Sequence, residues 1–297
     1  TGLKYMKLPS VTIKHLLEAG VHLGHKTFRW NPKMDKFIFG AKNSIHIIDL
    51  VQTLEMVNAA LIKIHECISS GGKILFVSTK KQAAEAVASL AKDTSQYYVN
   101  HRWLGGMLTN WKTISNSIKR YKKLNVDLKK ENTGFTKKEI LKMGIQRDKL
   151  ERSLGGIADM AKTPDMIFII DTNIEELAVK ESIKLKIPIV AVVDTNSNPE
   201  GIDYPIPGND DARRAINLYC ELIKQTILDA QKSIFKEDEI ESRDKTNFQE
   251  NKKDTVANKN TIVDKNNEDK KKTKSTVKKI SQSILSKVSA LTSKKTK

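Results

Sequence analysis

Four aspartates lie where an α/β protein could carry out chemistry. Asp171 and Asp194 each end an apolar run typical of a buried strand, and Asp210 and Asp211 stand at the start of a later helical segment. Because the carboxyl ends of parallel strands meet at one edge of a sheet, these carboxylates could together bind a divalent cation. Aspartates at such positions more often cap helices and turns, and no nucleophile–base pair accompanies them. We therefore expect no catalytic residues, no metal site and no cofactor.

The sequence also leaves open two other sites for small ligands, one for an anion and one for a metal ion. Residues 78–81 follow a strand-like run and precede a helical pattern, so an anion could sit at that helix N-terminus. The chain contains neither G-x-x-x-x-G-K-[ST] nor G-x-G-x-x-G, the glycine-rich motifs of nucleotide sites. His22 and His25 are close enough in sequence to share a metal, but no cysteine accompanies them. A structural or RNA-facing histidine is the favoured interpretation.

Two segments, 25–33 and 100–112, interleave cations with aromatic and amide side chains. RNA binding uses this combination, because Arg and Lys contact phosphates and planar groups stack on unpaired bases. The alternative is that Trp30, Trp103 and Trp111 are core anchors, the usual role of such large rings. The candidate RNA-binding residues here are His25, Lys26, Arg29, Trp30, Asn31, Lys33, Asn100, His101, Arg102, Trp103, Asn110 and Lys112.

Residues 109–153 carry two heptad-like apolar stripes separated by a short break. One stripe runs from Trp111 to Leu124 and the other from Ile140 to Leu154, with Arg147 as a polar seam position. Two such stripes predict an antiparallel helical hairpin inserted into a larger domain. Residues 112–153 hold 13 Lys or Arg against 5 Asp or Glu, so the hairpin is basic. The hairpin cations expected to contact phosphates are Lys119, Arg120, Lys122, Lys123, Lys137 and Lys138.

The hairpin interrupts an alternation of strand-like and helical patterns. Continuous apolar runs at 73–79, 165–171 and 187–194 are typical of strands that are buried on both faces. Helical patterns between them predict a doubly wound, three-layer α/β domain formed by residues 1–108 and 154–233. Cys67 and Cys220 stand far apart in helical patterns, which predicts reduced thiols in a cytosolic protein. No apolar run approaches the roughly 20 residues that span a membrane.

Charge is distributed unevenly along the chain. The net charge is +17, which favours a polyanionic partner. Residues 154–233 nevertheless hold 8 Lys or Arg against 13 Asp or Glu, so this part is acidic and suits a protein contact better than RNA. Residues 234–297 are rich in Lys, Asn and Ser and predict a disordered basic tail. Within that tail, 276–291 could alternatively form a basic amphipathic helix.

Several of these segments resemble the bacterial small-subunit (30S) ribosomal protein two family. The resemblance covers about residues 10–231 and stops before the tail. The residues that carry it are LEAGVHLGH at 17–25, WNPKM at 30–34, NHRWLGGMLTNWK at 100–112, LGGI at 154–157, IPIVAVVDTN at 187–196 and IPGNDDA at 206–212. It implies a flavodoxin-like α/β/α domain with an inserted coiled-coil hairpin.

The resemblance also implies a function. Members of that family are structural, non-enzymatic proteins of the cytoplasmic ribosome, with no membrane association. It implies binding to 16S rRNA at the junction of head and body, contacts with neighbouring 30S proteins, and help in tethering the multi-domain ribosomal protein that captures mRNA. Two rival interpretations are a metal- or nucleotide-dependent enzyme built on the four aspartates and an adaptor that acts through its tail.

Overall fold

The computed structural model describes residues 8–129 and 135–234 of the chain. These residues belong to one compact unit, Thr1–Ile234. The predicted disordered tail lies outside the described residues from residue 235 onward, and so does the amphipathic segment 276–291.

A five-stranded parallel sheet forms the centre of the domain, as the apolar runs predict. Its spatial order is β5-β4-β6-β7-β8, and each neighbouring pair runs parallel. Numbered within the sheet, this order is 2-1-3-4-5, the order of flavodoxin-like sheets. Every residue of β4, β6 and β7 is buried, which explains why these strands read as continuous apolar runs. The strands are β4 (Ile74–Val77), β5 (Tyr97–Val99), β6 (Met166–Ile170), β7 (Ile189–Val193) and β8 (Tyr204–Pro207).

Helices cover both faces of this sheet, each over its own apolar cluster. One cluster joins alternate strand residues such as Phe76 and Phe168 to four helices. The other joins the opposite strand residues, such as Leu75 and Ile167, to α6 and the base of the hairpin. The helices of the first face are α1 (Ile13–Ala19), α2 (Leu50–Ser69), α3 (Ala84–Asp93) and residues 213–234; α6 spans Glu176–Leu185.

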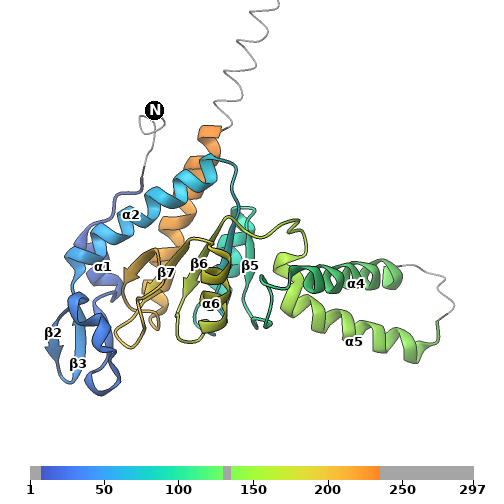
Figure 1. The fold of residues 1–297 in the computed structure, drawn as a ribbon, viewed down its shortest axis with the longest axis horizontal. Helices are drawn as coiled ribbons and strands as arrows, with labels where there is room; N and C mark the ends of the chain where they lie inside the picture. The colour runs from blue at the N-terminus through green and yellow to red at the C-terminus, as the bar shows by residue number, and fades with distance from the viewer. Residues whose placement is uncertain (1–7, 130–134, 235–297) are drawn as a thin grey trace, which may run out of the picture. The chain divides into compact units, whose positions relative to one another are not determined.

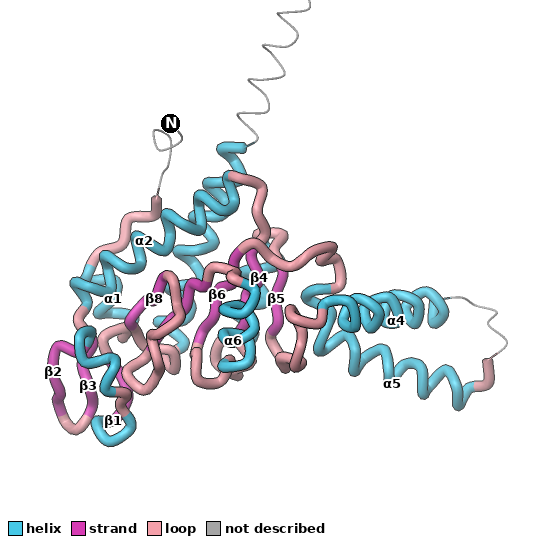
Figure 2. Tube along the Cα trace, in the orientation of Figure 1, coloured by secondary structure: helices cyan, strands magenta, loops and turns pink. Residues whose placement is uncertain are grey.

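The inserted hairpin consists of α4 (Trp111–Lys129) and α5 (Lys137–Leu154), which lie side by side in Figures 1 and 2. A capping box begins the second helix: the Thr136 hydroxyl accepts the Glu139 N–H, and the Glu139 carboxylate accepts the Thr136 N–H. Ile114 and Ile118 are buried at the base of α4, whereas Ile140 of the predicted seam is exposed. The seam is therefore closed at its base and open toward its far end.

A small antiparallel sheet precedes α2. It contains β1 (Leu23–Lys26), β3 (Ile45–Ile48) and β2 (Ile38–Lys42) in the order β1-β3-β2. The strands β2 and β3 form a hairpin whose turn lies at Asn43 and Ser44, both with positive φ. The Thr12 side chain caps α1, rather than Ser10, which is also a good N-cap residue.

None of the helices in the described ranges combines the length and apolar character needed to cross a bilayer.

Candidate nucleic-acid interface

A buried carboxylate holds the loop that carries the second cation–aromatic segment. Glu181 of α6 accepts the backbone N–H groups of Gly106 at 2.8 Å, Leu108 at 2.9 Å and Thr109 at 3.0 Å. It also accepts the indole N–H of Trp103 at 3.1 Å and the Thr109 hydroxyl at 3.1 Å. Gly106 has a φ of 80°, a conformation that other residues rarely adopt. One side chain thus fixes the backbone over residues 103–109.

The ionisation of Glu181 follows from these contacts. Burial raises the pKa of this carboxyl, but the backbone N–H groups of Thr109, Leu108 and Gly106 and the Trp103 indole lower it, and the net shift is downward. The carboxylate is therefore charged at neutral pH. Its hydrogen bonds are of the stronger, charge-assisted kind.

The loop divides its predicted RNA-binding residues between core and solvent. Trp103 is buried, so for this residue the core-anchor interpretation is confirmed. Asn100 is half-buried and donates to the Ala84 carbonyl at 3.4 Å. The exposed members of the set are His101, Arg102, Asn110 and Lys112. Since the loop leads directly into α4, its cations and those of the hairpin form one stretch of chain.

The first cation–aromatic segment is split in the same way. Lys26 and Arg29 are exposed, and Trp30 packs its ring 5.3 Å from that of His46. Asn31 caps the short 3-10 helix η3 (Pro32–Phe37), its side chain accepting the Lys33 N–H. Lys33 itself forms an ion pair with Glu200.

Three of the four aspartates of the rival enzyme hypothesis gather around a lysine. The Lys80 ammonium lies 3.1 Å from Asp171, 2.8 Å from Asp210 and 2.6 Å from Asp211. Burial lowers the pKa of Lys80, but the three carboxylates raise it by more than burial lowers it. The net shift is upward, so Lys80 carries its positive charge at neutral pH. The open anion site at 78–81 is also filled from within, because the Thr79 N–H donates to the Glu175 carboxylate at 2.6 Å.

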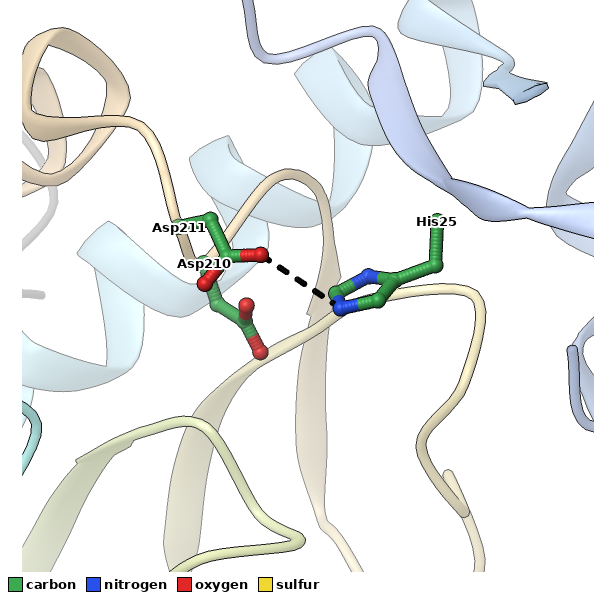
Figure 3. Close-up of side chains that lie close together, drawn as sticks. All are labelled: His25, Asp210 and Asp211. Carbon is green, nitrogen blue, oxygen red and sulfur yellow. Dashed lines mark ion pairs between the residues drawn. The ribbon is translucent and has the colours of Figure 1, made fainter. Parts of the chain in front are cut away.

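His25 connects this cluster to the small sheet. Its Nδ1 lies 3.0 Å from Asp194, and its Nε2 lies 3.4 Å from Asp211, the contact marked in Figure 3. The hydrogen bond with Asp194 raises the pKa of His25, with burial opposing it. Burial beside Asp194 and Asp171 raises the pKa of Asp210 to about 7, against the effect of Lys80. Donor atoms of His25, Asp210 and Asp211 lie within 4.8 Å of one another, and the Lys80 ammonium is paired with both of these carboxylates.

The backbone around His25 supports a structural role for the cluster. The His25 N–H donates to the Thr195 hydroxyl at 2.9 Å, and the Asn31 N–H donates to the Thr195 carbonyl at 2.8 Å. A Cβ on Gly24 would stand 2.6 Å from the Thr195 methyl group, so the chain needs glycine there. These contacts dock the small sheet onto the carboxyl edge of the large one.

The hairpin cations differ in their surroundings. Lys122 pairs with Asp159 at 3.0 Å, and Arg120 donates across the hairpin to Gln146 at 3.1 Å. The others, Lys119, Lys123, Lys137 and Lys138, are exposed.

Sequence reasoning did not identify Glu181 or the inward role of Lys80. A signal existed for Glu181, which shares a helix face with Ala178 and Ser182, both buried. A charged residue on the apolar face of a helix requires buried partners. For Lys80 the neighbouring Lys81 hides the signal, because only the structure shows which lysine turns inward.

A parallel α/β domain with a basic helical hairpin, a cation-bearing loop and clustered carboxylates paired with an internal lysine has the features of a polyanion-binding protein.

Comparison with known proteins identifies the family. Residues 16–230 match the sequence profile of ribosomal protein S2. The chain is 57% identical over 224 residues to the small ribosomal subunit protein uS2 of Parvibaculum lavamentivorans, a match that covers 75% of this chain and 88% of that protein. It is 58% identical over 224 residues to the uS2 proteins of Phenylobacterium zucineum and Sinorhizobium medicae, covering 75% of this chain and 76% and 88% of theirs. The chain belongs to the ribosomal protein S2 family and is a ribosomal protein, not an enzyme.

Proposed function

We propose that this protein is a structural constituent of the small ribosomal subunit and binds 16S rRNA there through residues 109–153 and the loop before them. The observation that carries the proposal is the family match over residues 16–230, in which relatives at 57–58% identity are small-subunit proteins. The excess of cations in the hairpin supports RNA as the partner, since phosphate contacts supply most of the affinity for nucleic acid.

Each part of the interface has its own task in this proposal. The hairpin cations neutralise phosphates, which gives affinity without sequence preference. His101 and Arg102 precede the stretch 103–109 that Glu181 fixes, and Lys112 follows it in α4, so these three residues set the register of docking. Lys26, Arg29 and Trp30 add a second contact from the small sheet. The site at the head–body junction follows from the resemblance, which places family members there.

The acidic part of the chain is the proposed protein-facing side. Residues 154–233 carry a net charge of −5, and Asp159 is 89% exposed in its side chain. Like-charge repulsion disfavours RNA against such a surface. We assign to it the neighbouring 30S proteins and the multi-domain protein that captures mRNA.

Sedimentation of a cell lysate through sucrose gradients tests the proposal. The protein is followed by immunoblot at low and at high salt. We expect co-migration with 30S subunits and 70S ribosomes that weakens as salt rises. A protein found only at the top of both gradients would exclude a ribosomal role.

A further inference from the structure

A surface pocket lies at the base of the hairpin, next to the stretch that Glu181 fixes. It is lined by residues of α3, of β5 and the loop after it, of α5 and of the short 3-10 helix η4 (Gly155–Ile157). β5 is the edge strand on the hairpin side of the parallel sheet, so no further strand covers this place (Figure 2). The pocket has a volume of about 370 Å³. Small-molecule sites occupy about 300–1,000 Å³, so this pocket suits one small ligand group rather than a length of chain.

Tyr98 of β5 gives the pocket an aromatic wall. The side chain is half-buried, and a Cβ on Gly156 would stand 2.8 Å from two carbons of its ring, so the ring is seated against the glycine. The Lys92 ammonium lies 5.8 Å from the ring centre. The Tyr98 hydroxyl has no hydrogen-bond partner among the described residues. A ring held in place at the wall of a pocket is a surface on which a base can stack.

Three side chains of the pocket can bind an anion. Lys92, His101 and Arg152 line it and are exposed. None of the three forms an ion pair or a side-chain hydrogen bond within the part of the chain that the structure describes. Lysine and arginine beside an aromatic ring match a nucleotide, because the cations contact its phosphate while the ring stacks on its base.

Two carboxylates also line the pocket and need an explanation in an anion site. Asp148 accepts a hydrogen bond from Arg147 Nε at 2.9 Å, so its charge is compensated on the same helix. Glu151 lies 4.0 Å from Arg147 Nε, which is longer than a hydrogen bond. Its oxygens can therefore accept from a ligand, and base amino groups are donors that carboxylates recognise. The pocket thus favours adenine, cytosine or guanine over uracil, which has no amino group.

We propose that this pocket holds a single unpaired nucleotide of 16S rRNA. Its base stacks on Tyr98, its amino group donates to Glu151, and its phosphate contacts the three anion-binding side chains. Loops and bulges of RNA supply such unstacked bases. The inference rests on the proposed function and deepens it. The hairpin cations contact phosphates without regard to sequence, whereas a pocket for one base selects a sequence.

Chemical probing of reconstituted subunits tests the pocket. 30S subunits depleted of this protein are saturated with the full-length chain and treated with dimethyl sulfate, kethoxal and a carbodiimide, which together modify exposed base edges of all four nucleotides. One A, C or G should be protected by the unchanged chain and become reactive with Tyr98→Leu and with Arg152→Gln. At fixed salt Tyr98→Leu should also bind about tenfold more weakly, as expected for the loss of one stacked base.

Each variant has a matched control. Tyr97 is the neighbour of Tyr98 in β5 and is also half-buried, so Tyr97→Leu should fold equally well and keep the protection. Urea unfolding of the two tyrosine variants checks that they are folded to the same extent. Lys138→Gln removes an exposed cation at the opposite end of α5 from Arg152. It should lower the affinity but leave the nucleotide protected at saturation.

Three outcomes would overturn the inference in whole or in part. If Tyr98→Leu and Arg152→Gln keep every protection of the unchanged chain at unchanged affinity, the pocket has no ligand on the subunit. If both bind more weakly without exposing a base, the pocket holds a protein side chain instead. A protected uridine would reject the role of Glu151. The proposed function fails separately, when the unchanged chain does not bind depleted subunits at all.

Discussion

Glu181 is the residue on which the geometry of the proposed RNA-binding loop depends. Glu181→Ala leaves the N–H groups of Gly106, Leu108 and Thr109 without their acceptor, so we expect a loss of about 2–4 kcal/mol in the free energy of unfolding. Because the pKa of Glu181 is lowered in the folded state, its contribution is complete above the ordinary glutamate pKa and disappears as pH falls through the lowered value. Urea unfolding at neutral and acidic pH measures both effects.

The control for this experiment lies on the same helix. Glu176 is exposed and forms an ion pair with Lys180. Glu176→Ala should change the free energy of unfolding by less than about 1 kcal/mol, as exposed pairs contribute little. Equal losses in the two variants would show that Glu181 does not anchor the loop.

Lys80 gives the carboxylate cluster a testable dependence on pH. Lys80→Met removes the cation from three carboxylates and should cost about 3–5 kcal/mol at neutral to basic pH. The folded-state pKa of Asp210, about 7, exceeds its ordinary value, so protonation favours the folded state and stability falls as pH rises toward 7. Without Lys80 this pKa rises further, and the deficit of the variant should therefore shrink on acidification.

Thermal unfolding of Lys80→Met and of the unchanged chain, from acidic to basic pH, measures how much stability the variant loses at each pH. Lys81→Met is the matched control, because the next residue is exposed and should tolerate the change. A deficit that stays constant with pH would contradict electrostatic compensation by Lys80.

For individual residues, the sequence predicted where acidic side chains gather but not which cation pairs with them. Asp171 and Asp210 could be placed at one sheet edge because parallel strands end there together. The partner could not be placed, since Lys80 meets Asp210 across 130 positions of the chain. Glu181 likewise meets Gly106 across 75 positions. Such contacts depend on the packing of whole elements, which local patterns do not encode.

Among the elements, the hairpin makes the clearest prediction about RNA. The triple variant Lys119→Gln, Lys123→Gln and Lys138→Gln removes three exposed charges without touching the buried base of the hairpin. We expect weaker binding to 30S subunits depleted of this protein. The slope of log affinity against log salt should fall by on the order of one for each lost phosphate contact.

A second triple variant, which also loses three positive charges, is the control for the hairpin variant. Lys162→Gln, Lys184→Gln and Lys224→Gln change residues in the acidic part of the chain. This variant should keep the original slope. The same reduction in both variants would mean that total charge, rather than the hairpin, sets the affinity.

The elements also show which patterns are decisive. The strands β4, β6 and β7 were predicted because burial on both faces leaves a continuous apolar run. The strand β1 was not, because its sequence LGHK lacks alternation and its register against β3 contains an irregularity.

At the scale of the whole molecule, a large share of the positive charge lies outside the part that the family shares. Residues 1–233 hold 35 Lys or Arg and 25 Asp or Glu, a net charge of +10, and residues 234–297 hold 17 and 10, a net charge of +7. The family match ends at residue 230. The tail therefore adds charge outside the region that the family model matches.

Truncation after residue 234 tests what this charge does. If the shared region is sufficient for docking, the shortened chain still enters 30S subunits. Losing cations near RNA weakens binding in proportion to the phosphate contacts they made, so the truncated chain should be released at lower salt than the full chain. Gradients over a salt series measure the release point. A full-length variant with the ten Lys of 270–297 changed to Gln distinguishes charge from length and should behave like the truncation. A truncated chain that no longer enters subunits at low salt would instead make the tail essential, as the adaptor hypothesis requires.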